Sequence, residues 1–308
     1  MNKVCLGLLL AASLLSSALA QTSPRVHLLR PFGQQPVSPS TLTITYNGGP
    51  VMTGTNTAYV VYYGAWTQHA KNIVNAYLST LGGSTMYNIN TTYFDGTKTH
   101  IQNVVLYDPS IDSIVDKYSL GKNLTDAQVQ QVVANAISAS KLPDDPNGVY
   151  FVLTWTDVTE SASFGSFCSA FCGYHGPSTS ISKGEVIKYS FIGDAATQCP
   201  SGCVASRVIG DSSSPNGDPG ADGVVNVLWH ELSESVSDPE VNLRTAWAGS
   251  CGESGDCCAW QFGKTFVTKN GSHANQRLGG RPFIAQLMLQ LTQEKVGTDN
   301  GVCARIKP

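Results

Sequence analysis

Residues 221–239, ADGVVNVLWHELSESVSDP, place one imidazole and several carboxylates at spacings that suit metal chemistry. At 3.6 residues per turn, His230, Glu234 and Asp238 recur on one side of a helix. Glu231 follows His230 directly and lies about 100° further around the same helix. An imidazole and a carboxylate one turn apart can bind a single zinc ion, and a neighbouring glutamate can activate the zinc-bound water. The segment therefore predicts a metal site in which His230, Glu234 and Asp238 are ligands. Glu231 is the predicted catalytic base.

The charge pattern of this segment supports the same interpretation. No lysine or arginine occurs between Val208 and Leu243, whereas a solvated helix face usually mixes both signs. The motif reads H-E-x-x-E, so Glu234 stands where the zincin motif H-E-x-x-H has its second histidine. The alternative is an acidic, exposed helix end with an unrelated histidine. Zinc is the expected metal, and calcium is the alternative because carboxylates predominate.

Two further acids lie in the cysteine-rich loop CGESGDCC at 251–258. A loop held by cysteines can return a carboxylate to a site, so Glu253 and Asp256 are candidate metal ligands, although exposed loop acids are common. His175, in the sequence CGYHG, is either a structural loop residue or a further ligand, and the structural interpretation is favoured.

Asp218 and Asp222 precede or begin the predicted helix in a turn-rich segment. Carboxylates at a helix N-terminus accept hydrogen bonds from unpaired backbone N–H groups. Calcium binding is the alternative, but the spacing is not that of an EF-hand loop, so capping is favoured.

The elements that must position these residues alternate between strand and helix. Short runs of β-branched and aromatic residues predict strands, and apolar residues at helical spacing predict helices. This order predicts an α/β fold with a mixed, largely parallel sheet and flanking helices, followed by a disulfide-rich C-terminal half that carries the zincin-like helix. For the run at 283–289, periodicity does not separate helix from strand. Strands are expected at 57–64, 101–107, 148–155 and 186–192, helices at 67–81 and 124–139, and stapled loops at 167–176 and 192–203.

The first residues have the pattern of a targeting segment. A lysine, a short apolar run and Ala18-Leu19-Ala20 predict a secretory signal peptide at 1–20, and no stretch is long and apolar enough to predict a membrane span. Residues 21–47 are rich in Pro, Ser and Thr and predict an extended leader. Residues 48–308 are then expected to form a single domain.

Nine cysteines, one of them in the predicted signal peptide, leave an even number in an exported protein. Disulfides are therefore favoured over the alternative of a zinc knuckle formed by Cys168, Cys172, Cys199 and Cys203. Adjacent Cys257 and Cys258 should pair with different partners. Connectivity is otherwise open. The triplets that begin at Asn90, Asn123 and Asn270 match the glycosylation motif.

The net charge of −3 and the charged fraction of 13% give no electrostatic basis for binding nucleic acid. An extracellular peptide or a wall component is the expected partner class, and the oligomeric state is left open. Trp229, Trp247 and Trp260 raise glycan binding as a further alternative, but such aromatics are more often part of the core.

Four motifs together resemble the EXORDIUM, or phosphate-induced protein, family of secreted proteins. The resemblance covers nearly all of the expected mature chain and implies export to the extracellular space or cell wall and a role in growth. It implies no settled chemical activity. The motifs are NGGPVMTG at 47–54, FCSAFCGYHG at 167–176, FIGDAATQCPSGC at 191–203 and PNGDPGADG at 215–223.

Two functional hypotheses follow. The first is a secreted, metal-dependent hydrolase of peptidase-like type, with Glu231 activating a metal-bound water. The second is a non-catalytic extracellular module for binding or growth signalling, in which the acidic helix is a calcium-dependent or merely solvated surface.

Overall fold

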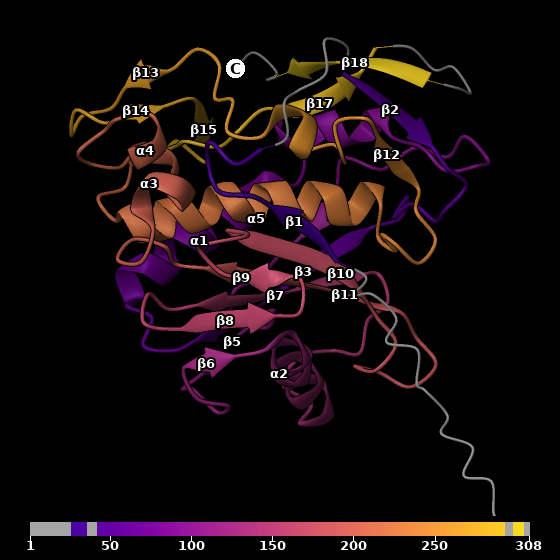
Figure 1. Cartoon of the computed structure of the whole chain (residues 1–308), viewed down its shortest axis with the longest axis horizontal. Helices are drawn as coiled ribbons and strands as arrows, with labels where there is room; N and C mark the ends of the chain where they lie inside the picture. Colours follow the sequence, from indigo (N-terminus) through magenta and orange to yellow (C-terminus); the bar gives the residue numbers. More distant parts are fainter. Residues whose placement is uncertain (1–25, 36–41, 293–297, 305–308) are drawn as a thin grey trace, which may run out of the picture.

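The computed structural model describes residues 26–35, 42–292 and 298–304, so the predicted signal peptide lies outside the described residues. Its centre is a seven-stranded sheet in the order β1-β10-β11-β7-β3-β4, with β5 also paired to β3 (Figure 1). The pairs from β11 to β4 and β5 are parallel, whereas β10 is antiparallel to β11 and β1 to β10. The predicted mixed, largely parallel sheet is thus confirmed. Its strands are β1 (His27–Leu29), β3 (Asn56–Tyr63), β4 (Val105–Leu106), β5 (Ser113–Asp116), β7 (Gly148–Thr154), β10 (Gly173–Ser178) and β11 (Ile187–Gly193).

Helices cover both faces of this sheet. Helix α2 (Asp126–Ser138) packs on β7 and β11 from one side, and α5 (Pro219–Ser237) packs on β7, β10 and β11 from the other, beside α1 (Gln68–Leu81) (Figure 1). Every residue of β7 is buried, which explains why its sequence is continuously apolar rather than alternating. Both predicted flanking helices, at 67–81 and 124–139, are confirmed.

Local capping explains where α1 and α2 begin. The side chain of Thr67 accepts the Ala70 N–H at 3.1 Å, which satisfies a backbone donor that the first turn leaves unpaired. Thr125 and Gln128 form a capping box in which each side chain accepts the other residue's backbone N–H.

Helix α5 is buried on all sides. Above it, on the side away from the large sheet, lies a four-stranded sheet in the order β12-β2-β18-β17 (Figure 1). All residues from Gly220 to Ser237 are buried, so the acidic side of the helix is not an exposed surface, as one alternative supposed. Carboxylates buried in this way need compensating partners. The second sheet consists of β2 (Thr43–Tyr46), β12 (Trp247–Gly249), β17 (Met288–Leu291) and β18 (Thr298–Ala304).

Short elements complete the fold. Besides the two larger sheets, the described residues form two 2-stranded sheets, one 3-stranded sheet and several short helices. None of the described helices has the length and apolarity that crossing a bilayer requires. These elements are β6 (Asn123–Leu124), β8 (Thr159–Ala162), β9 (Gly165–Ser166), β13 (Phe266–Val267), β14 (His273–Ala274), β15 (Gln276–Leu278), β16 (Arg281–Phe283), α3 (Pro200–Cys203), α4 (Ala205–Val208), η1 (Tyr87–Thr92) and η2 (Asp256–Cys258).

Several local predictions need correction. The segment predicted as a leader contributes β1 and β2, because Leu29 and Ile44 are fully buried and join two different sheets. The strand expected at 101–107 is only β4, and the loop expected at 167–176 ends in β10. Of the apolar run at 283–289, whose type was left open, only Phe283 lies in β16 and only Met288 and Leu289 lie in β17. Short edge strands carry too few residues for periodicity to detect them.

The described cysteines form four disulfides, which favour an oxidising compartment. Cys168–Cys199 and Cys172–Cys203 join the segment before β10 to the segment after β11, and they exclude a zinc knuckle. As predicted, the adjacent cysteines pair apart, in Cys251–Cys257 and Cys258–Cys303. The first of these closes a small loop beside α5.

The three glycosylation triplets differ in exposure. Asn90 is fully buried in η1, and its amide lies 3.5 Å from the hydroxyl of Ser233 on α5. A glycan there does not fit the fold. Asn123 and Asn270 are exposed.

Gly173 sets how closely α5 approaches β10. A Cβ atom at this position would lie 2.5 Å from Cγ1 of Val227 and 3.0 Å from the backbone oxygen of Phe191. We expect Gly173→Ala to lower the free energy of unfolding by about 1–3 kcal/mol, as overpacking usually does. Urea denaturation measures this loss of stability. Gly54→Ala is the matched control, since a Cβ there meets nothing within 4 Å. Equal stability of the two variants would contradict the predicted overpacking.

Candidate metal centre

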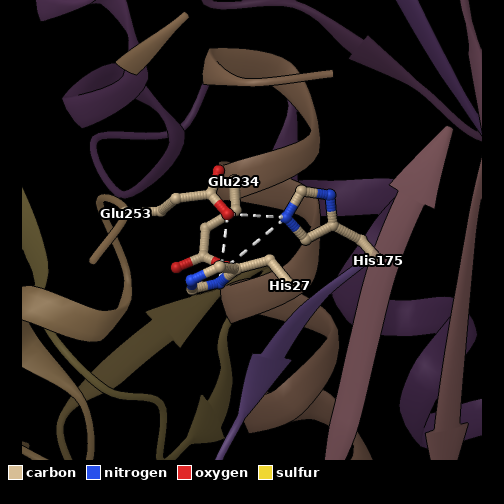
Figure 2. A group of neighbouring side chains, drawn as sticks. All are labelled: His27, His175, Glu234 and Glu253. Atoms are coloured by element: carbon tan, nitrogen blue, oxygen red, sulfur yellow. Dashed lines mark hydrogen bonds and ion pairs between the residues drawn. The ribbon is translucent and has the colours of Figure 1, made fainter. Parts of the chain in front are cut away.

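The carboxyl-terminal half of α5 meets three other parts of the chain at one buried cluster. His27 on β1 and His175 on β10 are directly paired across the two strands, so their side chains share one face of the sheet. Glu234 approaches from α5, and Glu253 from the loop closed by Cys251–Cys257. Figure 2 shows these four side chains turned toward a common centre.

The four side chains satisfy the spacing of a tetrahedral site. One ligand atom from each lies within 4.8 Å of the other three. Oε2 of Glu253 is 3.0 Å from Nδ1 of His27 and 3.3 Å from Nε2 of His175. Oε2 of Glu234 is 3.4 Å and 3.6 Å from the same two nitrogens. Zinc bonds of about 2.0–2.2 Å at tetrahedral angles require ligand atoms about 3.3–3.6 Å apart. The observed separations are close to this value.

The backbone of the disulfide loop fixes the orientation of Glu234. Its Oε1 accepts the N–H groups of Gly255 and Asp256, each at 3.1 Å, which leaves Oε2 directed to the cluster. A Cβ atom on Gly255 would lie 2.6 Å from Nδ1 of His230 and 2.9 Å from Oε1 of Glu234. Only glycine allows the loop to approach this closely. Such second-layer hydrogen bonds are usual around metal ligands.

A second group lies beside the first and shares Glu234. Nε2 of His230 is 3.1 Å from Oε2 of Glu234 and 3.8 Å from Oδ1 of Asp256. Asp256 also approaches His27, with Oδ2 3.1 Å from Nε2. The helical spacing therefore brings His230 and Glu234 together as predicted. The loop brings Glu253 and Asp256 to them.

Asp238 and Glu231 occupy different positions from these ligand atoms. Oδ1 of Asp238 accepts the N–H of Ala246 at 2.7 Å, and Asp238 belongs to neither group. Glu231 is fully buried against β10, where a Cβ on Gly173 would lie 3.1 Å from its Oε1. Among the described residues, neither carboxylate oxygen of Glu231 has a hydrogen-bond partner. A buried carboxylate in which neither oxygen has a partner is unusual.

Burial and close opposite charges shift the pKa values of several groups in the cluster. Burial alone would lower the pKa of His27, but the carboxylates of Asp256 and Glu253 raise it well above its ordinary value. In the same way, the carboxylate of Glu234 outweighs burial and raises the pKa of His230 to about 9. Burial raises the pKa of Glu253 well above its ordinary value. In the metal-free cluster, bound protons thus reduce the repulsion between the carboxylates. A divalent ion could neutralise these carboxylates instead.

Burial also raises the pKa values of two carboxyls beside the cluster. Burial raises the pKa of Glu231 to about 8 and that of Asp238 to about 6. Glu234 is the exception, because the imidazole of His230 and those of His175 and His27 lower its pKa well below the ordinary value despite burial. Among the described residues, only imidazoles, and no lysine or arginine, lie within ion-pair distance of Glu234, Glu253 or Asp256.

Sequence reasoning missed His27 and treated His175 as structural. His27 lies in a three-residue strand within the segment predicted as a leader, and no local pattern marks it. His175 carried a weak signal, because it lies three residues after Cys172, a candidate for a disulfide that could bring it to the site; in the structure Cys172 is bridged to Cys203 in α3. The buried Gln286, whose amide nitrogen is 3.0 Å from Nδ1 of His230, was also not identified.

Other candidate residues have structural contacts. Asp218 accepts the Ala221 N–H at 3.1 Å and caps α5, as expected, whereas Asp222 accepts the backbone N–H of Asn216 at 2.8 Å. Trp229, Trp247 and Trp260 are buried in the core, as the favoured interpretation expected, and are not available for glycan binding.

Comparisons with known proteins agree with the motifs. The family model described as "Phosphate-induced protein 1 conserved region" matches residues 44–276. Protein EXORDIUM-like 5 of Arabidopsis thaliana is 30% identical over 274 residues, 79% of this chain and 74% of that protein. Protein EXORDIUM-like 3 of the same plant is 30% identical over 229 residues, 68% of this chain and 65% of that protein.

Protein PHOSPHATE-INDUCED 1 of Nicotiana tabacum is 27% identical over 220 residues, 65% of this chain and 66% of that protein. No solved structure matches the chain. The matched segment contains the whole of α5 and the disulfide loop, while His27 and Gln286 lie outside it. The chain therefore belongs to the EXORDIUM family of phosphate-induced proteins.

Proposed function

We propose that this chain is an extracellular, growth-related protein that holds one zinc ion between His27, His175, Glu234 and Glu253. The observation that carries the proposal is the near-tetrahedral spacing of these four ligand atoms, from 3.0 to 3.6 Å along the four measured edges. Membership of the EXORDIUM family and the four disulfides support the extracellular, growth-related role.

The chemistry of the ligand set favours zinc over calcium. Two neutral imidazoles and two carboxylates balance the charge of one divalent ion in a buried site. Calcium takes six to eight oxygen ligands at about 2.3–2.6 Å and has little use for imidazole. Zinc accepts nitrogen and oxygen together in a four-coordinate shell.

The proposed ion links four separate elements. His27 belongs to β1, His175 to β10, Glu234 to α5 and Glu253 to the disulfide loop. A shell of four protein ligands is typical of structural rather than catalytic zinc. The ion would therefore hold the N-terminal strand and the disulfide loop against the sheet and helix, and so stabilise the extracellular form of the protein.

Metal analysis tests this proposal. The purified wild type should contain about one zinc per chain, and His175→Ala should contain almost none, because a tetrahedral site loses most of its affinity with one ligand. His69→Ala is the matched control, since His69 is an exposed histidine on α1, remote in sequence from the cluster, and should keep the ion. A wild type that takes up no zinc, or a His175→Ala variant that keeps it, would contradict the proposal.

A second candidate function is metal-dependent hydrolysis, which the buried, unpaired carboxylate of Glu231 favours. Catalytic zinc keeps one position open for water, so one protein ligand has to leave. His27 fits that role because its side chain is 25% exposed, whereas those of His175, Glu234 and Glu253 are buried. Sequencing of the new N-termini formed in a denatured protein substrate tests this, with Glu231→Gln as the inactive control. If the wild type and Glu231→Gln cleaved the substrate equally, the hydrolytic function would be excluded and the non-catalytic role would be retained.

A further inference from the structure

The second group beside the proposed zinc site contains His230, the histidine of the H-E-x-x-E motif. In the zincin motif the corresponding histidine binds the metal. We propose instead that His230 is a positioning residue, which orients Glu234 and does not bind the ion, and that Gln286 determines this role. The inference rests on the proposed zinc site and assigns Gln286 a function in it.

The first step is the orientation of the Gln286 amide. Its nitrogen donates to the backbone oxygen of Gly255 at 2.8 Å, and its oxygen accepts the N–H of Trp260 at 3.4 Å. Turning the amide over would place oxygen against oxygen and N–H against N–H. The amide nitrogen is therefore the atom that lies 3.0 Å from Nδ1 of His230.

The second step is that α5 itself holds Gln286 in place. The backbone N–H of Gln286 donates to Oδ1 of Asn226 at 2.7 Å, and its backbone oxygen accepts Nε1–H of Trp229 at 3.1 Å. Asn226 precedes His230 by about one turn of the same helix, and Trp229 is the residue directly before it. The Gln286 side chain is fully buried, so it has little freedom to turn.

The third step is the tautomer of His230. Because an amide N–H faces Nδ1, the neutral His230 ring of the zinc-loaded protein must accept at this nitrogen and carry its proton on Nε2. A protonated Nε2 has no lone pair for a metal ion. It lies 3.1 Å from Oε2 of Glu234, within ion-pair distance, which favours this carboxylate as an anion. The close backbone of Gly255 prevents the ring from moving away.

The consequence concerns both groups of candidate ligands. His230, Glu234 and Asp256 are close enough to share an ion, but the Gln286 amide withdraws His230 from that set. The ion is then left with His27, His175, Glu234 and Glu253. This assignment also separates the H-E-x-x-E motif here from a zincin motif, although the helical spacing is the same.

Zinc affinity of paired variants tests the assignment. His230→Gln keeps an N–H donor near Glu234 but is a poor zinc ligand, so it should bind about one zinc with affinity within about 10-fold of wild type. His230→Ala removes the donor and should weaken binding about 10–100-fold, as loss of a second-layer partner does. His175→Ala should lose the ion. If His230→Gln loses zinc as completely as His175→Ala, His230 is a ligand and the inference is wrong.

Spectroscopy provides a readout that a merely structural role would not change. In the zinc-loaded protein, nitrogen-15 NMR of the imidazole ring should show the proton of His230 on Nε2, and Gln286→Met should redistribute it. The visible spectrum of the cobalt-substituted protein should be the same for wild type and His230→Gln, because the ligand set is unchanged. A proton on Nδ1, or an altered cobalt spectrum, would overturn the inference while leaving the zinc site intact. A wild type that binds neither metal would overturn both proposals.

Discussion

Removal of zinc with a chelator at pH 7.5 should lower the melting temperature of the wild type by about 8–16 °C. A ligand present at about 1,000 times its dissociation constant stabilises the folded state by about 4 kcal/mol. In a protein of this size, each kcal/mol corresponds to about 2–4 °C. Differential scanning calorimetry without reductant measures the change while the disulfides stay intact. His175→Ala is the control, and its melting temperature should not respond to the chelator.

The loss on chelation should grow as the pH rises from 5.5 to 8. Burial raises the pKa of Glu253 and brings that of Glu231 to about 8, so the metal-free fold is penalised as these carboxyls ionise above their unfolded value of 4.5. The raised pKa values of His27 and His230 act in the same direction, because the stability they contribute below 6.5 is lost as the pH approaches about 9.

The ionisation of Glu234 changes the stability of the metal-free protein in the opposite direction. Its lowered pKa contributes stability above 4.5 that disappears only in acid, so the metal-free protein should be most stable in mildly acidic solution. Zinc binding improves with pH because its ligands must lose their protons. A chelator effect that is equal at pH 5.5 and pH 8 would show that zinc and these protons do not compete.

The central parts of the fold were predictable because they are long and repetitive. The apolar runs at β3 and β7 and the 3.6-residue spacing in α1 and α2 each extend over several turns or ladder pairs. In the structure, Thr67 and Thr125 cap these two helices.

The candidate site was only partly predictable, because half of it depends on contacts between distant segments. His230 and Glu234 follow from helical spacing alone. His27 reaches the cluster through a three-residue edge strand, whose pairing with β10 has no signature in either segment. Glu253 depends on the Cys251–Cys257 bridge, and cysteine spacing alone does not determine connectivity. Gln286 lies in a connection between β16 and β17, where no local pattern marks an amide as important.

The burial of α5 is the physical reason that spacing alone was insufficient. On a half-exposed helix the polar side would face water, and H-E-x-x-E would present its side chains to a common open site. Here a sheet lies on each side of the helix, so every polar side chain has to find a partner within the protein. Glu234 finds the loop N–H groups, His230 finds Gln286, and Glu231 finds none among the described residues.

Glu231→Gln should therefore stabilise the metal-free protein at pH 8. The pKa of Glu231 is raised to about 8 from an ordinary 4.5, a difference worth at most about 5 kcal/mol, and structural relaxation should reduce this to about 1–3 kcal/mol. The advantage should vanish near pH 4.5, where the carboxyl is protonated in both folded and unfolded chains. Urea denaturation of both proteins in chelator, at several pH values, measures it. A variant that is less stable than wild type at pH 8 would contradict this account.

Glu160→Gln is a control that separates the effect of burying a carboxyl from the effect of its distance to the proposed ion. Glu160 is also buried, has a pKa raised to about 8, and lies 3.4 Å from the hydroxyl of Tyr174. Tyr174 and His175 are adjacent on β10, so Glu160 lies on the opposite face of the sheet from the cluster. Both substitutions should stabilise the metal-free protein at pH 8. Zinc should reduce the advantage only of Glu231→Gln, because a cation a few ångströms away lowers the pKa of Glu231 and leaves that of Glu160 unchanged. If zinc changed neither advantage, Glu231 would be too far from the ion to act as its base.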